Sequence, residues 1–414
     1  MNLAVLSVCA LALAIVVSCV TTLNVGVLAL ALAWIIGVYF GGMSVNSVMA
    51  GFPTALFLTL VGMTLLFTLA QCNGTLDRLA HHAVRPCRGN RGAIPIMFFV
   101  LAATLASLGP GNIATAAILA PMAMATAVRA GIPLFLMAIM VGNGSNAGSL
   151  SPFAPTGIIV NGLMARSGMV GFEVPTYLYN LGAHAIVAFG GYFLLGGLKL
   201  FARSSTVEAV EMDPTPAADI TFRTRHWITL AVIATLILSV LFFEVNVGMG
   251  AFMAAVVLVL LGAGDDGEAV KRMPWRVIVM VCGVTVLIAL LEKAQGIDLL
   301  VSLVTKVANG KTVTGVIAFL TGIISVYSST SGVVLPAFLP MVPGLAQQLG
   351  ADPVAIASSM NVGGHLVDVS PLSTIGALCL AGAPIEDARA LFNKLLAWGL
   401  SMSIVGAMLC YLVF

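Results

Sequence analysis

The sequence predicts an all-α polytopic membrane protein, and its composition, segment lengths and internal repeat all favour this fold class. Of 414 residues, 60% are hydrophobic and only 8% are charged, and the mean hydropathy is +1.10. Soluble domains carry about 25% charged residues, so this chain cannot build a water-facing surface. Apolar stretches of about 20 residues, the length of a membrane-crossing helix, recur from end to end. The short alternating segments of a membrane barrel are missing, so we expect helices.

Other features of the composition exclude several classes of protein. The net charge of +2 is too small to indicate a nucleic-acid partner. The first 20 residues lack a basic leader, which favours a retained first helix over a cleaved signal peptide. The seven cysteines show no metal or redox spacing. Hydrolase and metalloenzyme motifs are missing too, so we expect neither an enzyme nor a cofactor other than a coupling ion.

A repeat of about 220 residues divides the sequence into two halves. Five matches occur in order at offsets of 218 to 222 residues: Pro53 with Pro274, Gly62 with Gly283, Gly74 with Gly296, Gly109–Asn112 with Tyr327–Thr330, and Ser151–Gly157 with Ser370–Gly376. One match alone is weak, whereas five at nearly one offset indicate a duplication.

Each half is predicted to hold five membrane crossings, a re-entrant hairpin and a broken helix. In the first half we expect helices near 3–21, 24–41 and 52–71, a basic amphipathic stretch at 72–91, a hairpin at 93–129 with its tip at 107–115, a helix at 133–165 broken at 142–152, and a fifth helix at 174–200. After a polar linker at 203–226, we expect helices at 227–244, 246–263 and 275–293, a hairpin at 312–349 with its tip at 327–332, a helix at 353–384 broken near 361–371, and a last helix at 388–414. An odd number of crossings inverts the second half relative to the first.

The distribution of basic residues predicts the orientation. With the N-terminus outside, the cytoplasmic side holds 14 Lys and Arg residues and the outer side holds four. The positive-inside rule therefore places both termini on the outer, periplasmic side of a bacterial inner membrane. The first hairpin then opens from the cytoplasm and the second from outside.

The two hairpin tips have the chemistry of an anion site. Each tip precedes the start of a helix, where free N–H groups and the positive end of the helix dipole favour a carboxylate. The first tip contains Gly111 and Asn112, and the second offers four hydroxyls between Ser328 and Ser331. The alternative interpretation is a pair of tight turns capped by their own Ser and Asn side chains.

The two breaks supply candidate cation ligands. The glycines of 142–152 would let carbonyl oxygens turn inward toward a hard cation such as Na⁺. The second break contains His365 and Asp368, and an ionisable group inside a membrane is a functional candidate. Asp368 could ligate a cation or carry a coupled proton; alternatively, the two side chains staple the loop by pairing with each other or with the backbone. Because no Lys or Arg lies in either tip or break, we expect anion binding to depend on a bound cation.

These motifs resemble those of the ion-transporter superfamily that includes the divalent-anion/sodium symporters, and within it the malonate/dicarboxylate carrier (MatC-like) family. The runs Gly142–Gly157 and His365–Gly376 carry the resemblance. It implies a homodimer and an elevator mechanism. In that division, 1–92 and 227–311 form the scaffold, 203–226 is a cytoplasmic linker, and 93–202 and 312–414 form the transport domain.

The resemblance also implies ligand residues. The symporter family has a Ser-Asn-Thr signature at each tip; here the first tip keeps Asn112 and the second keeps Ser329 and Thr330 but lacks the Asn. For the substrate we predict Gly111, Asn112, Ser151, Pro155, Thr156, Ser328, Ser329, Thr330, Ser370, Pro371 and Thr374. For the cation, expected to be Na⁺, we predict Asn112, Asn143, Gly144, Asn146, Ser149, Thr330, Ser331, Gly363 and Asp368.

The predicted function is secondary active transport of small dicarboxylates such as malonate, succinate or malate, with Na⁺-coupled uptake. The alternative is a proton-coupled or exchange carrier for another small organic anion. A channel is a remote third possibility, because a pore would need repeated polar rings, whereas this chain gathers its polarity at four short segments. The expected partners are the anion, Na⁺, the lipid bilayer and a second copy of the chain.

Overall fold

The computed structural model describes residues 2–84, 90–202 and 221–414, and throughout these residues all regular secondary structure is helical. Six helical segments in this part of the chain are long and apolar enough to cross a membrane: Thr54–Cys72, Gly111–Ala130, Trp275–Lys293, Thr330–Leu349, Pro353–Ala381 and Ile385–Val413. Shorter apolar helices accompany them. The prediction of a helical, polytopic membrane protein is confirmed.

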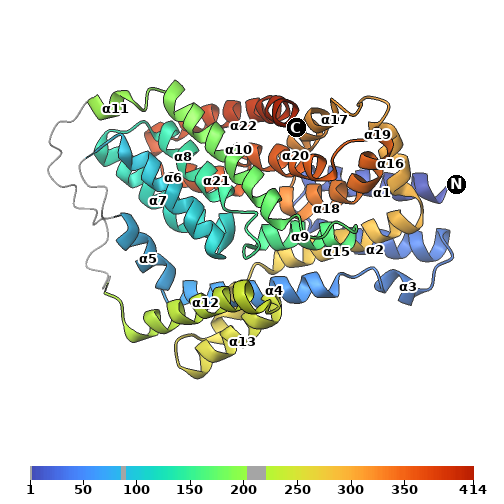
Figure 1. Ribbon diagram of the computed structural model, residues 1–414, viewed down its shortest axis with the longest axis horizontal. Helices are drawn as coiled ribbons and strands as arrows, with labels where there is room; N and C mark the ends of the chain where they lie inside the picture. Colours follow the sequence, from blue (N-terminus) through green and yellow to red (C-terminus); the bar gives the residue numbers. More distant parts are fainter. Residues whose placement is uncertain (1, 85–89, 203–220) are drawn as a thin grey trace.

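The first half contains α1 to α11 (Figure 1). These are α1 (Leu3–Val20), α2 (Val25–Ile35, continued by a wider turn at Ile36–Phe40), α3 (Val45–Met49), α4 (Thr54–Cys72), α5 (Thr75–Val84), α6 (Ala93–Leu108), α7 (Gly111–Ala130), α8 (Leu134–Ala147), α9 (Pro155–Arg166), α10 (Glu173–Leu194) and α11 (Lys199–Ala202). The turn between α6 and α7 is the first hairpin tip.

The second half repeats this order of elements from α12 onward. It contains α12 (Thr224–Phe243), α13 (Val247–Leu260), α14 (Asp266–Arg272), α15 (Trp275–Lys293), α16 (Gly296–Val304), α17 (Val313–Ser325), a helical turn at Thr330–Val334, α18 (Leu335–Phe338), a turn at Leu339–Met341, α19 (Val342–Leu349), α20 (Pro353–Leu366) with a turn at Val367–Val369, α21 (Thr374–Ala381) and α22 (Ile385–Val413). The second hairpin returns in short pieces because prolines interrupt it at Pro336, Pro340 and Pro343.

The breaks begin later than predicted. Helix α8 continues to Ala147, so the first interruption is 148–154 and not 142–152. Helix α20 continues to Leu366, and the second interruption, which includes the turn Val367–Val369, lies at 367–373 and not at 361–371. The glycines here allow close packing instead: a Cβ on Gly144 would lie 2.5 Å from Phe99 O, and one on Gly363 would lie 2.2 Å from Ala318 O. The short helices α3, α14 and α16 were not predicted, and residues 85–89 and 203–220 lie outside the described part of the chain.

The helices that precede the hairpins cross between the halves. Helix α2 packs on α15, and α13 packs on α4. A Cβ on Gly283 would lie 2.1 Å from Gly26 O, and one on Gly62 would lie 2.5 Å from Gly248 O. Glycine at both members of each crossing lets the backbones touch, as is common between membrane helices. The second helix of each half is therefore held by the third helix of the other half.

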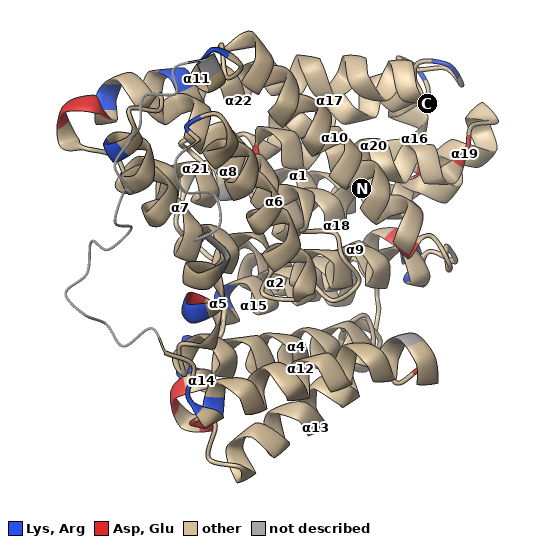
Figure 2. Cartoon of the chain, turned by 60° about the vertical axis from the view of Figure 1, so that its left-hand side comes forward, with Lys and Arg blue, Asp and Glu red and all other residues tan. Residues whose placement is uncertain are grey.

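The hairpins and broken helices pack together as one group. Helix α8 packs on α6, α7 and α10, and α20 packs on α17 and α22. Helix α10 also contacts α20, which joins the two halves. Figure 1 shows this group above a layer that contains α4, α12 and α13, and Figure 2 shows the same layer from another side.

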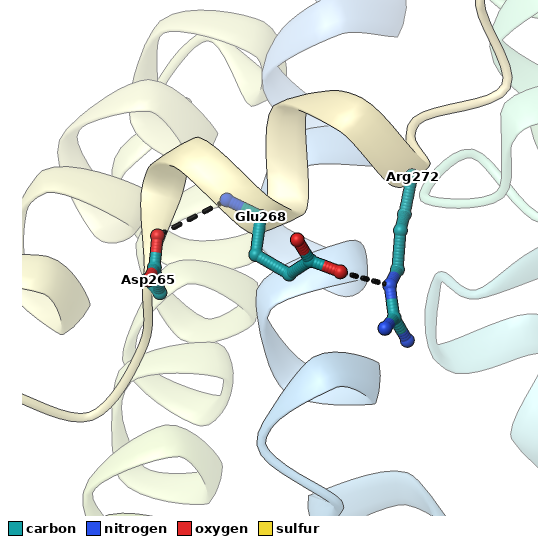
Figure 3. Close-up of polar contacts among 3 residues, drawn as sticks. All are labelled: Asp265, Glu268 and Arg272. Carbon is teal, nitrogen blue, oxygen red and sulfur yellow. Dashed lines mark hydrogen bonds and ion pairs between the residues drawn. The ribbon is translucent and has the colours of Figure 1, made fainter.

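Charged residues gather at one end of the helices, around α5, α11 and α14 (Figure 2). In α14, Asp265 caps the helix by accepting from the Glu268 amide at 3.0 Å, and Glu268 pairs with Arg272 at 2.7 Å (Figure 3). The corresponding helix α3 has no charged residue and is capped by Ser44. Two repeat-related helices therefore have opposite surface chemistry.

Candidate functional site

A cavity of about 260 Å³ lies where both hairpin tips meet the second break. It is lined by Asn112 and Ile113 from the first tip, by Ser325, Val326, Tyr327, Ser328, Ser329, Thr330 and Ser331 from the second tip, and by His365, Asp368, Leu372, Ser373, Thr374 and Ile375 from the second break. Its volume is below the roughly 300–1,000 Å³ of sites for drug-sized ligands, so it suits a small molecule.

Three helical segments begin at the cavity wall. Helix α7 starts at Gly111, the second tip's helical turn starts at Thr330, and α21 starts at Thr374. Ser329 caps the turn by accepting from the Gly332 amide at 3.1 Å, and Ser373 caps α21 through the Gly376 amide at 3.4 Å. The N–H groups at a helix start favour an anion, and three such starts border this cavity.

The second tip is tied to the second break by Thr330 and Asp368. The Thr330 hydroxyl lies 2.9 Å from Asp368 Oδ1 and 3.3 Å from the Gly364 carbonyl oxygen. Asp368 is half-buried, and its backbone carbonyl also accepts from the Ser373 hydroxyl. Among the described residues, Asp368 is the only carboxylate in the lining, and none of those lining residues is Lys or Arg. The wall therefore combines helix-start donors with one acid.

His365 is bound to the backbone of its own helix. Its Nδ1 lies 2.9 Å from the Asn361 carbonyl oxygen, and the ring is 1% exposed. In the described residues its Nε2 has no hydrogen-bond partner. The Nδ1 contact agrees with the interpretation that His365 pairs with the backbone and so fixes the loop. That interpretation does not account for Nε2.

The first break is closed by its own polar residues. Asn112 Nδ2 donates to Asn146 Oδ1 at 2.9 Å, and Asn146 Nδ2 donates to His365 O at 3.4 Å. Ser149 donates to Asn146 O at 2.7 Å, and Ser151 donates to Ser107 O at 2.7 Å. These bonds hold the first tip against the first break.

The predicted site residues therefore fall into two groups. Those that line the cavity are Asn112, Ser328, Ser329, Thr330, Ser331, Asp368 and Thr374. Those that do not line it are Gly111, Asn143, Gly144, Asn146, Ser149, Ser151, Pro155, Thr156, Gly363, Ser370 and Pro371. Gly144 and Gly363 lie inside continuous helices, where their glycine character serves close packing, so inward-turned carbonyls at these two positions are not observed.

Sequence reasoning also missed residues. Ser325 and Tyr327 flank the second tip, and Ser373 follows the second break; all three line the cavity. On α10, Asn180 donates to Asn146 O at 2.8 Å, and His184 Nδ1 lies 2.9 Å from Asn143 Oδ1. Their i, i+4 spacing on an otherwise apolar helix was the signal that could have revealed them.

Residues 1–149 match the model of a family described as "Dicarboxylate carrier protein MatC N-terminus". The crystal structure of the YdaH transporter of Alcanivorax borkumensis is similar, with a TM-score of 0.59 over 89% of this chain and 86% of that chain at 16% sequence identity. At that identity the likeness shows the fold alone. No curated protein matches the chain.

The family match over residues 1–149 agrees with the MatC-like resemblance in that part of the chain. The matched family is described as a carrier, in agreement with the prediction that the chain is not an enzyme.

Proposed function

We propose that this MatC-like chain is a secondary active transporter that takes up small dicarboxylates together with a cation, with Na⁺ as the expected coupling ion. One observation carries the proposal: a small cavity combines three helix starts with a single carboxylate, Asp368, and its described lining residues include no Lys or Arg. Helix starts favour an anion, and the carboxylate favours a cation.

The anion side of the site is formed by the two tips and the start of α21. The hydroxyls of Ser328 and Ser331 and the helix starts at Thr330 and Thr374 can donate to carboxylate oxygens. A volume of about 260 Å³ fits a C3 or C4 diacid better than a large organic anion. The family match over residues 1–149 supports the same substrate class.

The cation side is formed by Asp368 and Thr330, whose oxygen atoms suit a hard cation. A dianion beside the Asp368 carboxylate would be repelled unless a cation lay between them. Binding both ions brings the net charge of the loaded site closer to zero, which lowers the cost of moving it through the membrane. The coupling therefore follows from charge balance, and neither ion is expected to cross efficiently alone.

We propose an elevator movement for transport, with the group around α6 to α10 and α17 to α22 moving against the remaining helices. The glycine contacts between α2 and α15 and between α13 and α4 support a rigid scaffold. We further propose a homodimer in the bacterial inner membrane, with inverted halves and both termini on the periplasmic side.

Uptake by purified protein in liposomes tests the proposal. Labelled malonate, succinate and malate are offered with an inward Na⁺ gradient, an inward proton gradient or neither. We expect Na⁺-dependent accumulation above the external concentration, abolished by a sodium ionophore. Protein-free liposomes are the control, and absence of accumulation of every diacid under both gradients would overturn the proposal.

The second candidate is a proton-coupled or exchange carrier, which the half-buried Asp368 favours. Accumulation driven by the proton gradient alone would identify proton coupling. Uptake that requires preloaded diacid, without any cation gradient, would identify exchange.

A further inference from the structure

We propose that His365 Nε2 accepts a hydrogen bond from the transported anion, so that the site selects diacids that carry a hydrogen-bond donor at one end. The donor is an O–H group, supplied either by a protonated second carboxyl or by a hydroxyl substituent. This inference rests on the proposed function, because it specifies the substrate chemistry of the same cavity.

The hydrogen bonds of His365 determine which ring nitrogen carries the proton. The Asn361 carbonyl oxygen can only accept, so Nδ1, at 2.9 Å, must be the donor. The ring is 1% exposed, and burying an imidazolium without an ion-pair partner is costly, so the ring is neutral. Nε2 then holds a lone pair, and within the described residues no donor reaches it.

The matching residue of the first half has the hydrogen-bond donor that His365 lacks. Asn146 matches His365 at the repeat offset, 219 residues earlier, and its Oδ1 accepts from Asn112 at the first tip. The residue matching Asn112 at the second tip is Thr330, which directs its hydroxyl to Asp368 and to the Gly364 carbonyl instead. His365 Nε2, the acceptor in the second half, therefore lacks a donor like the one that Asn112 provides to Asn146 in the first half. A ligand in the cavity can supply this donor.

Ser325 provides a second unpartnered group in the same wall. It is 3% exposed, lines the cavity, and its hydroxyl has no partner in the part of the chain that the structure describes. The matching Ser107 is engaged with Ala103 O at 2.6 Å and with the Tyr177 hydroxyl at 2.9 Å. The second half thus leaves free polar atoms where the first half closes on itself.

The cavity wall is consequently polarised. Helix starts present donors, whereas His365 and Asp368, one turn apart on the second break, present acceptors. An ionised carboxylate suits the donors, but next to the acceptors it would face a lone pair and a negative charge. A group with an O–H donor satisfies His365, while Asp368 remains available for the cation.

Competition against labelled succinate uptake by the full chain in liposomes tests the inference. The two competitors are succinamate, a monoanion whose far end donates N–H, and monomethyl succinate, a monoanion whose far end only accepts. We expect succinamate to inhibit at concentrations about 3- to 10-fold lower than the ester, the worth of one hydrogen bond. Equal inhibition while succinate still accumulates overturns this inference alone; no accumulation of any diacid overturns the proposed function.

Three variants identify the residue responsible. His365→Leu removes the acceptor, so the ratio of the inhibitory concentrations of the ester and the amide should fall to about one. His365→Gln retains an acceptor oxygen and should restore part of the preference. Thr321→Val removes a buried polar group that does not line the cavity and bonds only to its own helix, and the preference should persist. A preference unchanged in His365→Leu overturns the inference, and if that variant does not fold, the wild-type ratio and His365→Gln decide.

The two sources of the donor are separated by substrate and pH. If a hydroxyl is the donor, malate competes better than succinate at alkaline pH, and His365→Leu removes the difference. If a protonated carboxyl is the donor, acidification strengthens succinate binding in the wild type but not in His365→Leu. The variant retains the other titratable groups of the lining, Asp368 and Tyr327, and the neighbouring His184 on α10, so the difference between the two proteins reports on His365. If neither pattern is observed, the inference is overturned.

Discussion

The Thr330 hydroxyl donates to Asp368 Oδ1 at 2.9 Å and so joins the second hairpin tip to the second break. The bond crosses the wall of the cavity at its single carboxylate. It places the Asp368 carboxylate beside the start of a helical segment. In the proposed transporter, this contact between tip and break would determine how the anion and the cation are held together.

Replacing Thr330 with Val should weaken cation-dependent uptake. The change keeps the shape of the side chain but removes a hydrogen bond to a charged group, worth about 1.5–3 kcal/mol, or roughly 10- to 100-fold in half-saturating Na⁺. Sodium titration of succinate uptake in liposomes measures it. Thr321→Val is the matched control, since this buried threonine on α17 bonds only to its own helix and should leave the titration unchanged. Equal effects of both variants would contradict the role of Thr330.

Replacing Asp368 with Asn should remove the dependence of anion binding on the cation. The amide retains a similar shape and an acceptor oxygen but carries no charge, so Na⁺ loses its counter-charge in the cavity. We expect accumulation against a gradient to fall at least 10-fold, while Na⁺-independent exchange of diacid persists. Asp352→Asn at the start of α20 is the control: Asp352 is exposed, and Asn also caps helices well. Unaltered Na⁺ dependence in Asp368→Asn would exclude Asp368 as the cation ligand.

Asn112 in the first tip and Asn146 in α8 should contribute to stability as a coupled pair. Asn112 and Asn146 share a buried hydrogen bond of 2.9 Å, so replacing either with Ala removes the same interaction. A double-mutant cycle on the denaturation of the detergent-solubilised protein should give a coupling energy of about 0.5–1.5 kcal/mol. The control cycle combines Asn112→Ala with Asn73→Ala, because Asn73 bonds to Thr229 and Ala263 O instead. Additivity in the first cycle would show that the two residues are not coupled.

The helices were predicted well from sequence because the signal that defines them is local. The predicted segment 275–293 coincides with α15, since an apolar run begins after Pro274 and ends at the charged Lys293. The short helices α3 and α14 were missed because five to seven residues carry too little periodicity to be recognised.

The breaks and the cavity were predicted only in part, because their details depend on tertiary contacts. The sequence around Gly144 predicts a break, yet α8 continues through this position. Glycine is needed there because the Phe99 carbonyl oxygen occupies the space that a Cβ would take. Ser107 and Ser325 occupy matching positions in the two halves, and only packing shows that Ser107 is bonded while the Ser325 hydroxyl has no partner among the described residues. No local pattern determines which of the two serines lines the cavity.

The glycine contacts between the halves should tolerate no side chain. A Cβ on Gly283 would lie 2.1 Å from the Gly26 carbonyl oxygen, so Gly283→Ala must separate α15 from α2. Overpacking of this kind costs about 1–3 kcal/mol, which we expect as a lower melting temperature in detergent. Gly190→Ala on α10 is the matched control, because nothing lies within 4 Å of its Cβ position. It should be neutral or stabilising, and equal melting of both variants would contradict the crossing.

The repeat-related helices α3 and α14 should lie on opposite faces of the membrane if the halves are inverted. Asn46 on α3 and Asp266 on α14 are exposed and 220 residues apart. In a cysteine-free background, we expect Asn46→Cys to react with a membrane-impermeant maleimide on intact cells, and Asp266→Cys to react only after permeabilisation. The charged surface of α14 and the uncharged surface of α3 favour this assignment under the positive-inside rule.

Asp387→Cys at the start of α22 is the control for the cytoplasmic face, since it is exposed and precedes Arg389. It should label together with Asp266→Cys. Labelling of Asn46→Cys and Asp266→Cys from one face would mean that the halves are parallel, and the two hairpins would then open from the same side. A cavity between tips that open from opposite sides depends on inversion, so this measurement also tests whether the site can be reached in turn from each face.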